Sequence, residues 1–282
     1  VYAFIGLAVL ALAALIASRR GNGAVSPNPP KVLALTDFPG TETTPSLSPD
    51  GSLVAFSWNG GTESNLDIYV RTVNSSALSR VTKTIGNAFS PSFSPDGRRI
   101  AFYRRAGDSS YIHIVSADSQ NLVRTAGLGL NVGPEFQFPS RSPLAPAPDL
   151  ASLSWSPRGE LAYVDKSSPG EPYSVFVALP PNWPGQKVTT PPPGIRGDGS
   201  PSFSPDGRSL AFVRSLDESA ADLYIVSLND GSSRRLTHDG RRISGITWAP
   251  DGKSIIFSTE RSGLPTLWRI NVETLVLEPV RQ

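Results

Sequence analysis

The 282-residue sequence contains no cysteine, which excludes disulfides, cysteine-ligated zinc and thiol nucleophiles. Its two histidines, His113 and His238, are little material for a histidine-ligated metal or a Ser-His-Asp triad. Neither sign of charge is in large excess, because 26 basic and 24 acidic residues leave a net charge of +2. A nucleic-acid-binding surface needs a dense basic patch. We therefore expect no catalytic residue, no cofactor, no metal and no bound nucleic acid.

Proline and glycine are abundant, with 27 and 25 residues, and 39% of the sequence is hydrophobic. This share of proline and glycine is typical of a turn-rich protein and lies below that of low-complexity chains. The length suits one all-β domain or two smaller domains. The composition therefore predicts a folded protein with a hydrophobic core and many turns.

The sequence opens on an apolar run, VYAFIGLAVLALAALIA, that has no charged side chain. As a helix it is roughly 26 Å long, close to the ~30 Å of a bilayer core. A cleaved signal peptide is the alternative, but it needs a basic region before the apolar stretch, and the chain begins inside that stretch. A buried globular helix is disfavoured because the segment has no polar face. We predict a transmembrane helix at residues 1–18, in contact with the lipid bilayer, in a fragment whose natural start lies upstream.

Residues 19–30 predict a flexible linker, rich first in glycine and then in proline. Arg19 and Arg20 follow the span directly and by themselves favour a cytoplasmic location for what comes next. The residues before Val1, which carry the other half of this comparison, are absent. The membrane orientation therefore depends on how many basic residues precede the span, compared with Arg19 and Arg20 after it.

One phrase returns five times after the linker. The copies are TPSLSPDGSLVAFSW from Thr44, SPSFSPDGRRIAFYR from Ser90, ASLSWSPRGELAYVD from Ala151, SPSFSPDGRSLAFVR from Ser200 and SGITWAPDGKSIIFS from Ser244. Most copies lie about 45 residues apart, which is the period of a four-stranded propeller blade. The repeat therefore predicts an all-β propeller.

Each copy contains a tight turn. Proline fits its second position, aspartate accepts local backbone N–H groups, and glycine permits a positive φ. The predicted turn residues are Asp50, Gly51, Asp96, Gly97, Gly159, Asp206, Gly207, Asp251 and Gly252. The aspartates would also suit a ring of cation ligands, but a repeat places them at matching positions without any ligand. We interpret them as structural.

Three strands follow the turn-preceding strand in each copy. The strand after the turn is apolar throughout, which predicts burial on both faces. Residues 31–36 look like a fourth strand without the three before it, so we expect a six-bladed ring within residues 31–282, with three strands lost beyond Gln282. A closed five-bladed ring is the alternative, but it leaves that strand unpaired.

Two segments interrupt the repeat. Leu128–Asp149 has no clear strand pattern and predicts a loop, which is either a binding element or a tolerated insertion. Trp183 lies in a Pro/Gly stretch with no periodic reason to be there, and is a candidate contact residue. The other tryptophans we expect in the core, at equivalent strand positions. Clusters of arginine near strand ends predict solvated blade edges, with a basic rim as the alternative.

These motifs resemble a known family. The SPDG turn, the AF strand, the DIYV or DLYIV strand and the RRLT ending are similar to the WD-like repeats of the TolB-type six-bladed propeller. The apolar span, linker and LTDFPGTETTPSLSPDGSLVAFSW resemble the sensor half of membrane-spanning regulators of the CadC type, in which a winged helix, or in a related arrangement a kinase domain, precedes the span. Arg158 departs from the usual aspartate, and no lipoprotein-binding motif can be placed.

The resemblance implies a non-catalytic, membrane-tethered propeller that acts as an extracytoplasmic binding or sensing module of a signalling or transcription-regulatory protein. It would lie on the periplasmic side of a bacterial inner membrane and bind a protein or peptide on one propeller face. An envelope scaffold for protein interactions or transport is the first alternative. The substrate-gating propeller of a peptidase is the second, although the sequence has no GxSxG nucleophile elbow.

Overall fold

The computed structural model describes residues 35–280, with gaps at 62–64, 84–85, 108, 118–135, 140–149, 181 and 183. The predicted membrane helix, the linker, most of the strand at 31–36 and Trp183 lie outside the described residues. No helix within the described residues is long and apolar enough to cross a membrane.

The described residues form five four-stranded antiparallel sheets, here called blades 1 to 5. Blade 1 contains β1 (Glu42–Leu47), β2 (Leu53–Trp58), β3 (Asp67–Thr72) and β4 (Leu78–Arg80). Blade 2 contains β5 (Asn87–Phe93), β6 (Arg99–Ala106), β7 (Ser109–Ser116) and β8 (Phe136–Pro139). Blade 3 contains β9 (Ser154–Trp155), β10 (Leu161–Asp165), β11 (Ser174–Ala178) and β12 (Gln186–Lys187).

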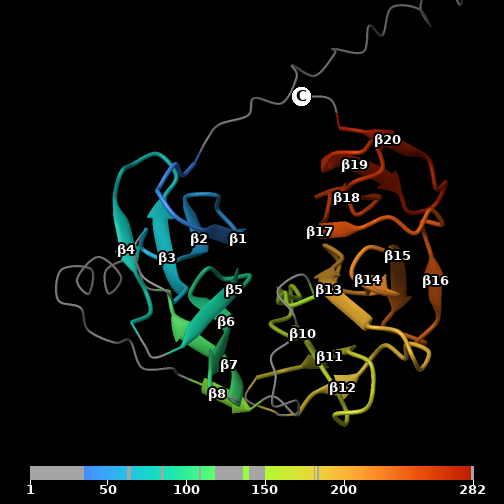
Figure 1. Cartoon of the computed structure of the whole chain (residues 1–282), viewed down its shortest axis with the longest axis horizontal. Helices are drawn as coiled ribbons and strands as arrows, with labels where there is room; N and C mark the ends of the chain where they lie inside the picture. The colour runs from blue at the N-terminus through green and yellow to red at the C-terminus, as the bar shows by residue number, and fades with distance from the viewer. Residues whose placement is uncertain are drawn as a thin grey trace, which may run out of the picture. The chain divides into compact units, whose positions relative to one another are not determined.

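Blade 4 contains β13 (Gly197–Phe203), β14 (Ser209–Ser215), β15 (Ala221–Ser227) and β16 (Ser233–Arg235). Blade 5 contains β17 (Ile243–Trp248), β18 (Ser254–Thr259), β19 (Thr266–Asn271) and β20 (Leu277–Pro279). Strands pair in chain order within every blade, and consecutive blades contact one another. The first strands β1, β5, β13 and β17 lie toward the centre, and β4, β12 and β16 lie on the outside (Figure 1). This arrangement is a β-propeller.

Two expectations need correction. The described residues form five blades and not six, because the three further strands that a sixth blade requires are not among them; Leu35 and Thr36, the described end of the expected extra strand, lie in no strand. The segment Leu128–Asp149 is not wholly a loop, since it contains β8, which pairs with β7 as the fourth strand of blade 2. The fourth strand of blade 2 therefore lies inside the segment expected to be a loop.

The faces at which neighbouring blades meet are buried by a repeated packing unit. At one cross-strand position of every blade, rings from the second and third strands face each other: Phe56 and Tyr69, Phe102 and His113, Tyr163 and Phe176, Phe212 and Tyr224, Phe257 and Trp268. Ring centroids in the first four pairs are 5.4 to 6.2 Å apart. In blades 2 to 5 the unit packs against small and branched side chains of the preceding blade. Such pairs contribute beyond their buried area.

Blade 1 has no preceding blade among the described residues, and residues Leu35–Thr41, here called the strap, cover its aromatic pair instead. Phe38 stacks on Trp58 with centroids 4.9 Å apart, and the Trp58 indole donates to the Pro39 carbonyl at 2.9 Å. Phe56 and Tyr69 are consequently buried. On the opposite end, blade 5 has an uncovered face: Leu267 is 43% exposed, whereas its equivalents Ile68, Ile112 and Leu223 are at most 1% exposed.

The turns between the first and second strands share one local structure. Gly51, Gly97, Gly159, Gly207 and Gly252 all have positive φ, between 66° and 83°. In blades 1, 2 and 4 the turn serine donates its hydroxyl to the turn aspartate, as from Ser48 to Asp50 at 2.6 Å, whereas blade 5 has Ala249 in place of the serine. In blade 3, where Arg158 replaces the aspartate, Ser156 donates to Glu160 at 2.8 Å instead. A carboxylate two residues later thus restores the missing acceptor.

Turn glycines also pack against the preceding blade. A Cβ on Gly207 would lie 3.2 Å from Cδ of Pro157, one on Gly97 would lie 3.6 Å from Cδ of Pro49, and one on Gly51 would meet nothing within 4 Å. The three glycines have nearly the same φ, from 68° to 69°. Backbone strain is therefore matched among them, and only the packing differs.

We expect Gly51→Ala, Gly97→Ala and Gly207→Ala each to lower the free energy of unfolding by about 1–2 kcal/mol through the positive φ, with an additional loss for Gly207→Ala. Denaturant unfolding of the three variants measures this ranking. Equal losses would show that the proline contact contributes nothing, and no loss at Gly51 would refute the strain argument.

A candidate binding site where the inner strands meet

Hydroxyl side chains recur on the first strand of every blade. Ser46, Ser92, Ser154, Ser202 and Thr247 lie five residues before the turn glycines. Thr44, Ser90, Ser152 and Ser200 lie seven residues before them, and Gly245 takes this place in blade 5. Because the first strands converge, the repeat brings these hydroxyls together from all five blades.

The first strands bend where the hydroxyls lie. Thr44, Ser90 and Ser200 have φ of 50°, 55° and 48°, which is strained for residues with a Cβ. Each precedes a proline, and the pairing register with the second strand shifts at the same place. Such a bulge interrupts the alternation of side chains between faces. Successive residues of one strand therefore line the same space.

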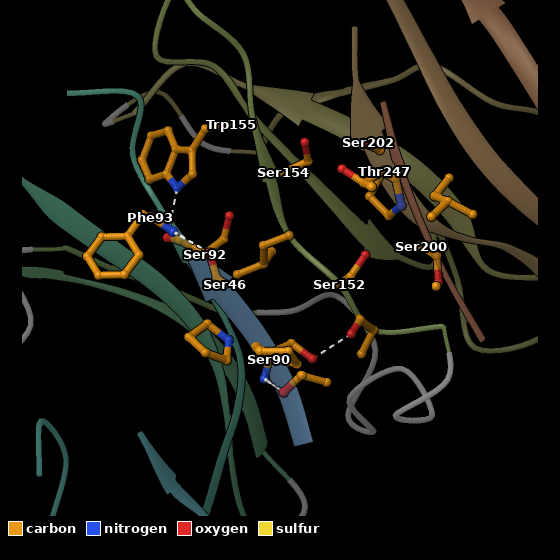
Figure 2. Close-up of a pocket in the computed structure, with 18 of the residues that line it drawn as sticks. Ser46, Ser90, Ser92, Phe93, Ser152, Ser154, Trp155, Ser200, Ser202 and Thr247 are labelled. Atoms are coloured by element: carbon orange, nitrogen blue, oxygen red, sulfur yellow. Dashed lines mark hydrogen bonds between the residues drawn. The ribbon is translucent and has the colours of Figure 1, made fainter. Parts of the chain in front are cut away.

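That space is a cavity of about 430 Å³. Figure 2 shows the hydroxyls of Ser152, Ser154 and Ser202 around it, with Trp155 and Phe93 at one side. Among the described residues, the lining is composed of serine, threonine, proline, glycine and apolar residues, with no charged side chain. A volume of this size holds a small molecule.

Some of the hydroxyls and indoles hold adjacent blades together. The backbone N–H of Phe93 donates to Ser46 Oγ at 3.2 Å, and that of Phe203 donates to Ser154 Oγ at 3.0 Å. The Trp155 indole donates to the Ser92 carbonyl at 3.1 Å, and the Trp248 indole to the Ser202 carbonyl at 3.0 Å. These bonds position the lining.

Other hydroxyls remain available. Among the described residues no hydrogen bond engages the side-chain oxygens of Ser92, Ser152 or Ser202. Ser46 and Ser154 accept a backbone N–H and keep their own O–H to donate. The cavity thus offers several neutral hydrogen-bonding groups in a fixed frame.

The sequence matches the family described as the TolB beta propeller domain over residues 30–142 and 147–280. The chain belongs to this family. Among curated proteins, this TolB-type propeller is 31% identical over 164 residues to the Tol-Pal system protein TolB of Bordetella pertussis, covering 57% of this chain and 32% of that protein. It is 28% identical over 157 residues to dipeptidyl-peptidase 5 of Porphyromonas gingivalis, covering 51% of this chain and 22% of that protein.

Among solved structures, TolB from Acinetobacter baumannii has a TM-score of 0.65 at 15% identity, covering 84% of this chain and 53% of that chain. At this identity the likeness establishes the fold alone. The curated matches span only 10% to 32% of the relatives' own lengths. Activities and partners of the whole relatives therefore do not transfer directly to this TolB-type propeller.

The turn residues singled out from the sequence lie apart from this cavity. Hydrogen bonds from Ser48 and Ser52 lower the pKa of Asp50 to about 2. The pKa values of Asp96 and Asp206 are lowered in the same way, by the hydroxyls of Ser94 and Ser204. Within the described ranges no group of three or more His, Asp or Glu residues has the arrangement of a metal site. The carboxylates of Asp50, Asp96 and Asp206 each accept a hydrogen bond from the serine of their own turn.

The tryptophan and arginine expectations are partly corrected. Trp155 and Trp248 are equivalent in the fold, but Trp58 ends a second strand and Trp268 lies in a third. Two of the clustered arginines form ion pairs with buried aspartates and therefore do not support a basic rim. Arg214 pairs with the buried Asp198 at 2.7 Å, and Arg235 pairs with Asp222 at 2.6 Å. Burial raises the pKa of Asp198, which Arg214 opposes.

The cavity was missed in the sequence because its serines were grouped with the turns beside them. The available signal was the recurrence of a hydroxyl five residues before all five turn glycines and seven residues before four of them. A turn needs only the nearer residues, so the more distant hydroxyls had no local explanation.

His113 takes the aromatic place in blade 2. It is buried, its ring stacks on Phe102 at 5.4 Å, and its Nε2 has no hydrogen-bond partner among the described residues. Burial, with the nearby Arg104 charge, lowers the pKa of His113 to about 4. The imidazole is therefore neutral at pH 7 and acts as a ring in the packing unit.

Because the pKa of His113 falls from 6.5 in the unfolded chain to about 4, we expect stability to be lost as pH drops from 6.5 to 4, by up to about 3 kcal/mol. His113→Phe removes this loss, because phenylalanine does not titrate. Denaturant unfolding at pH 7 and pH 4.5 tests the difference. The exposed His238→Phe is the matched control and should keep the wild-type dependence on pH. Identical pH profiles for His113→Phe and wild type would contradict the assignment.

We expect Ser154→Ala to cost about 1–2 kcal/mol in unfolding free energy, because the Phe203 N–H loses its acceptor. Ser202→Ala occupies the equivalent position in the next blade but removes an unengaged hydroxyl, so its stability should stay within about 0.5 kcal/mol of the parent. Thermal and urea unfolding separate the two. Equal effects would show that structural and available hydroxyls had been misassigned.

Proposed function

We propose that this TolB-type propeller is the ligand-binding module of a membrane-tethered signalling or transcription-regulatory protein, with residues 1–18 as the membrane anchor. In this proposal it lies on the periplasmic side of a bacterial inner membrane. The observation that carries the binding role is the 430 Å³ cavity, which offers unengaged hydroxyls from several blades.

Binding is favoured over chemistry at this cavity. A serine nucleophile needs a base within hydrogen-bond reach, and the described residues that line the cavity include no histidine, lysine, aspartate or glutamate. The inner strands are also held rigidly by bonds from blade to blade, which suits a preformed site. We therefore assign the propeller a recognition role.

The substrate-gating propeller of a peptidase is the second candidate. It is favoured by the alignment with dipeptidyl-peptidase 5, in which half of this chain matches less than a quarter of that protein. The alignment with TolB similarly favours an envelope scaffold as the third. Hydrolysis of a chromogenic dipeptide by the full-length protein would favour the peptidase.

The periplasmic location predicts the behaviour of two reporters fused after Gln282 in the full-length protein. Alkaline phosphatase, active only in the periplasm, should be active, and β-galactosidase, active only in the cytoplasm, should not. Arg19 and Arg20 by themselves favour the cytoplasmic side, so this location requires that more basic residues flank the other end of the span in the full-length protein. Activity of the cytoplasmic reporter alone would refute transmembrane sensing, because the propeller would then lie on the same side as its output domain.

A further inference from the structure

We propose that the inner-strand cavity binds a small uncharged polyhydroxylated molecule, a sugar or sugar alcohol. This inference rests on the proposed binding function and names the class of ligand for the same site. It follows from three properties of the lining: its lack of charge, its alternation of hydroxyls with apolar residues, and the prolines at the centre of its strands.

The lack of charge selects against ionic ligands. Thr44, Ser92, Ser152, Ser202 and Thr247 supply neutral dipoles, and in the part of the chain that the structure describes no arginine, lysine, aspartate or glutamate lines the cavity. An ion that enters loses hydration without gaining a counter-charge, which is costly. A neutral ligand has no such loss.

The hydroxyls match a ligand whose own polar groups are hydroxyls. A serine oxygen both donates and accepts, so it can pair with either role of a sugar hydroxyl. Apolar side chains stand between the hydroxyls on each strand, at Pro45, Pro91, Leu153, Pro201 and Ile246. These provide contacts for the C–H surface of a sugar ring. Polar and apolar groups therefore alternate both on the cavity lining and on the sugar that it would bind.

The prolines disfavour an extended peptide. The inner strands are the edge strands of their sheets, and their free edges face the cavity. A peptide that added as a further strand would need backbone N–H donors there, and Pro45, Pro91 and Pro201 have none. The positive φ of the residue before each proline also breaks the regular ladder. Recognition therefore depends on side-chain hydroxyls.

The test is titration calorimetry of the purified full-length protein with maltose and mannitol as neutral probes. Gluconate and glucosamine are the matched charged probes, and an uncharged Gly-Ser hexapeptide represents a polypeptide ligand. Fluorescence of Trp155, which lines the cavity, provides a second readout. We expect at least one neutral probe to bind, and the charged probes to bind at least tenfold more weakly.

Two variants locate the binding. Ser92→Ala and Ser202→Ala should each weaken binding of the neutral probe by about 2- to 10-fold without changing the unfolding midpoint. Ser76→Ala, at an exposed turn that does not line the cavity, should leave the affinity unchanged.

Several outcomes would overturn the inference: no binding of either neutral probe, equal binding of charged probes, or binding that both variants leave intact. Binding of the hexapeptide alone would assign the cavity to a polypeptide, and would leave the proposed sensing function standing. The two reporter fusions test the proposed sensing function separately, because they measure on which side of the membrane the propeller lies.

Discussion

A four-stranded sheet that is apolar on both faces is stable in water only when each face finds a partner. This constraint accounts for the architecture, because blades 2 to 5 each present a ring pair to the blade before them and blades 1 to 4 each present small and branched side chains to the blade after them. The strap fills the same requirement for blade 1, where Phe38 replaces a neighbouring sheet. The cavity is a geometric result of the same packing, since consecutive sheets that share a common inner edge bring their first strands together and leave room between them.

The local parts of this fold were predictable from sequence, because their causes lie within a few residues. The SPDG turn combines a proline, a hydrogen-bonding aspartate and a glycine, and all five turn glycines have positive φ. Burial of the second strands followed from their continuous apolar runs, and β10 is buried along its whole length. Even the departure at Arg158 has a local remedy in Glu160, although the sequence argument did not identify it.

The remaining features depend on contacts between distant residues. β8 pairs with β7, and its own sequence offers only the short alternation of Phe136, Gln137 and Phe138 between two prolines, which is too short to indicate a strand without that partner. The available hydroxyls of Ser92 and Ser202 become a site only when blades converge, and nothing local distinguishes them from Ser46 and Ser154, which hold the blades together. His113 shows the same limit: its sequence neighbours predict a buried strand, but the aromatic role is set by Phe102 across the sheet.

The contact between Pro157 and Gly207 restricts which substitutions the turns of two adjacent blades can accept. A larger residue at the glycine is tolerated only if the proline of the preceding blade moves or shrinks, so the two positions should change together even though 50 residues separate them. The corresponding pair in blades 1 and 2, Pro49 and Gly97, is looser and should vary more independently. Blades exchanged between relatives by recombination would therefore need compatible turns on both sides of each junction, whatever their internal strands contain.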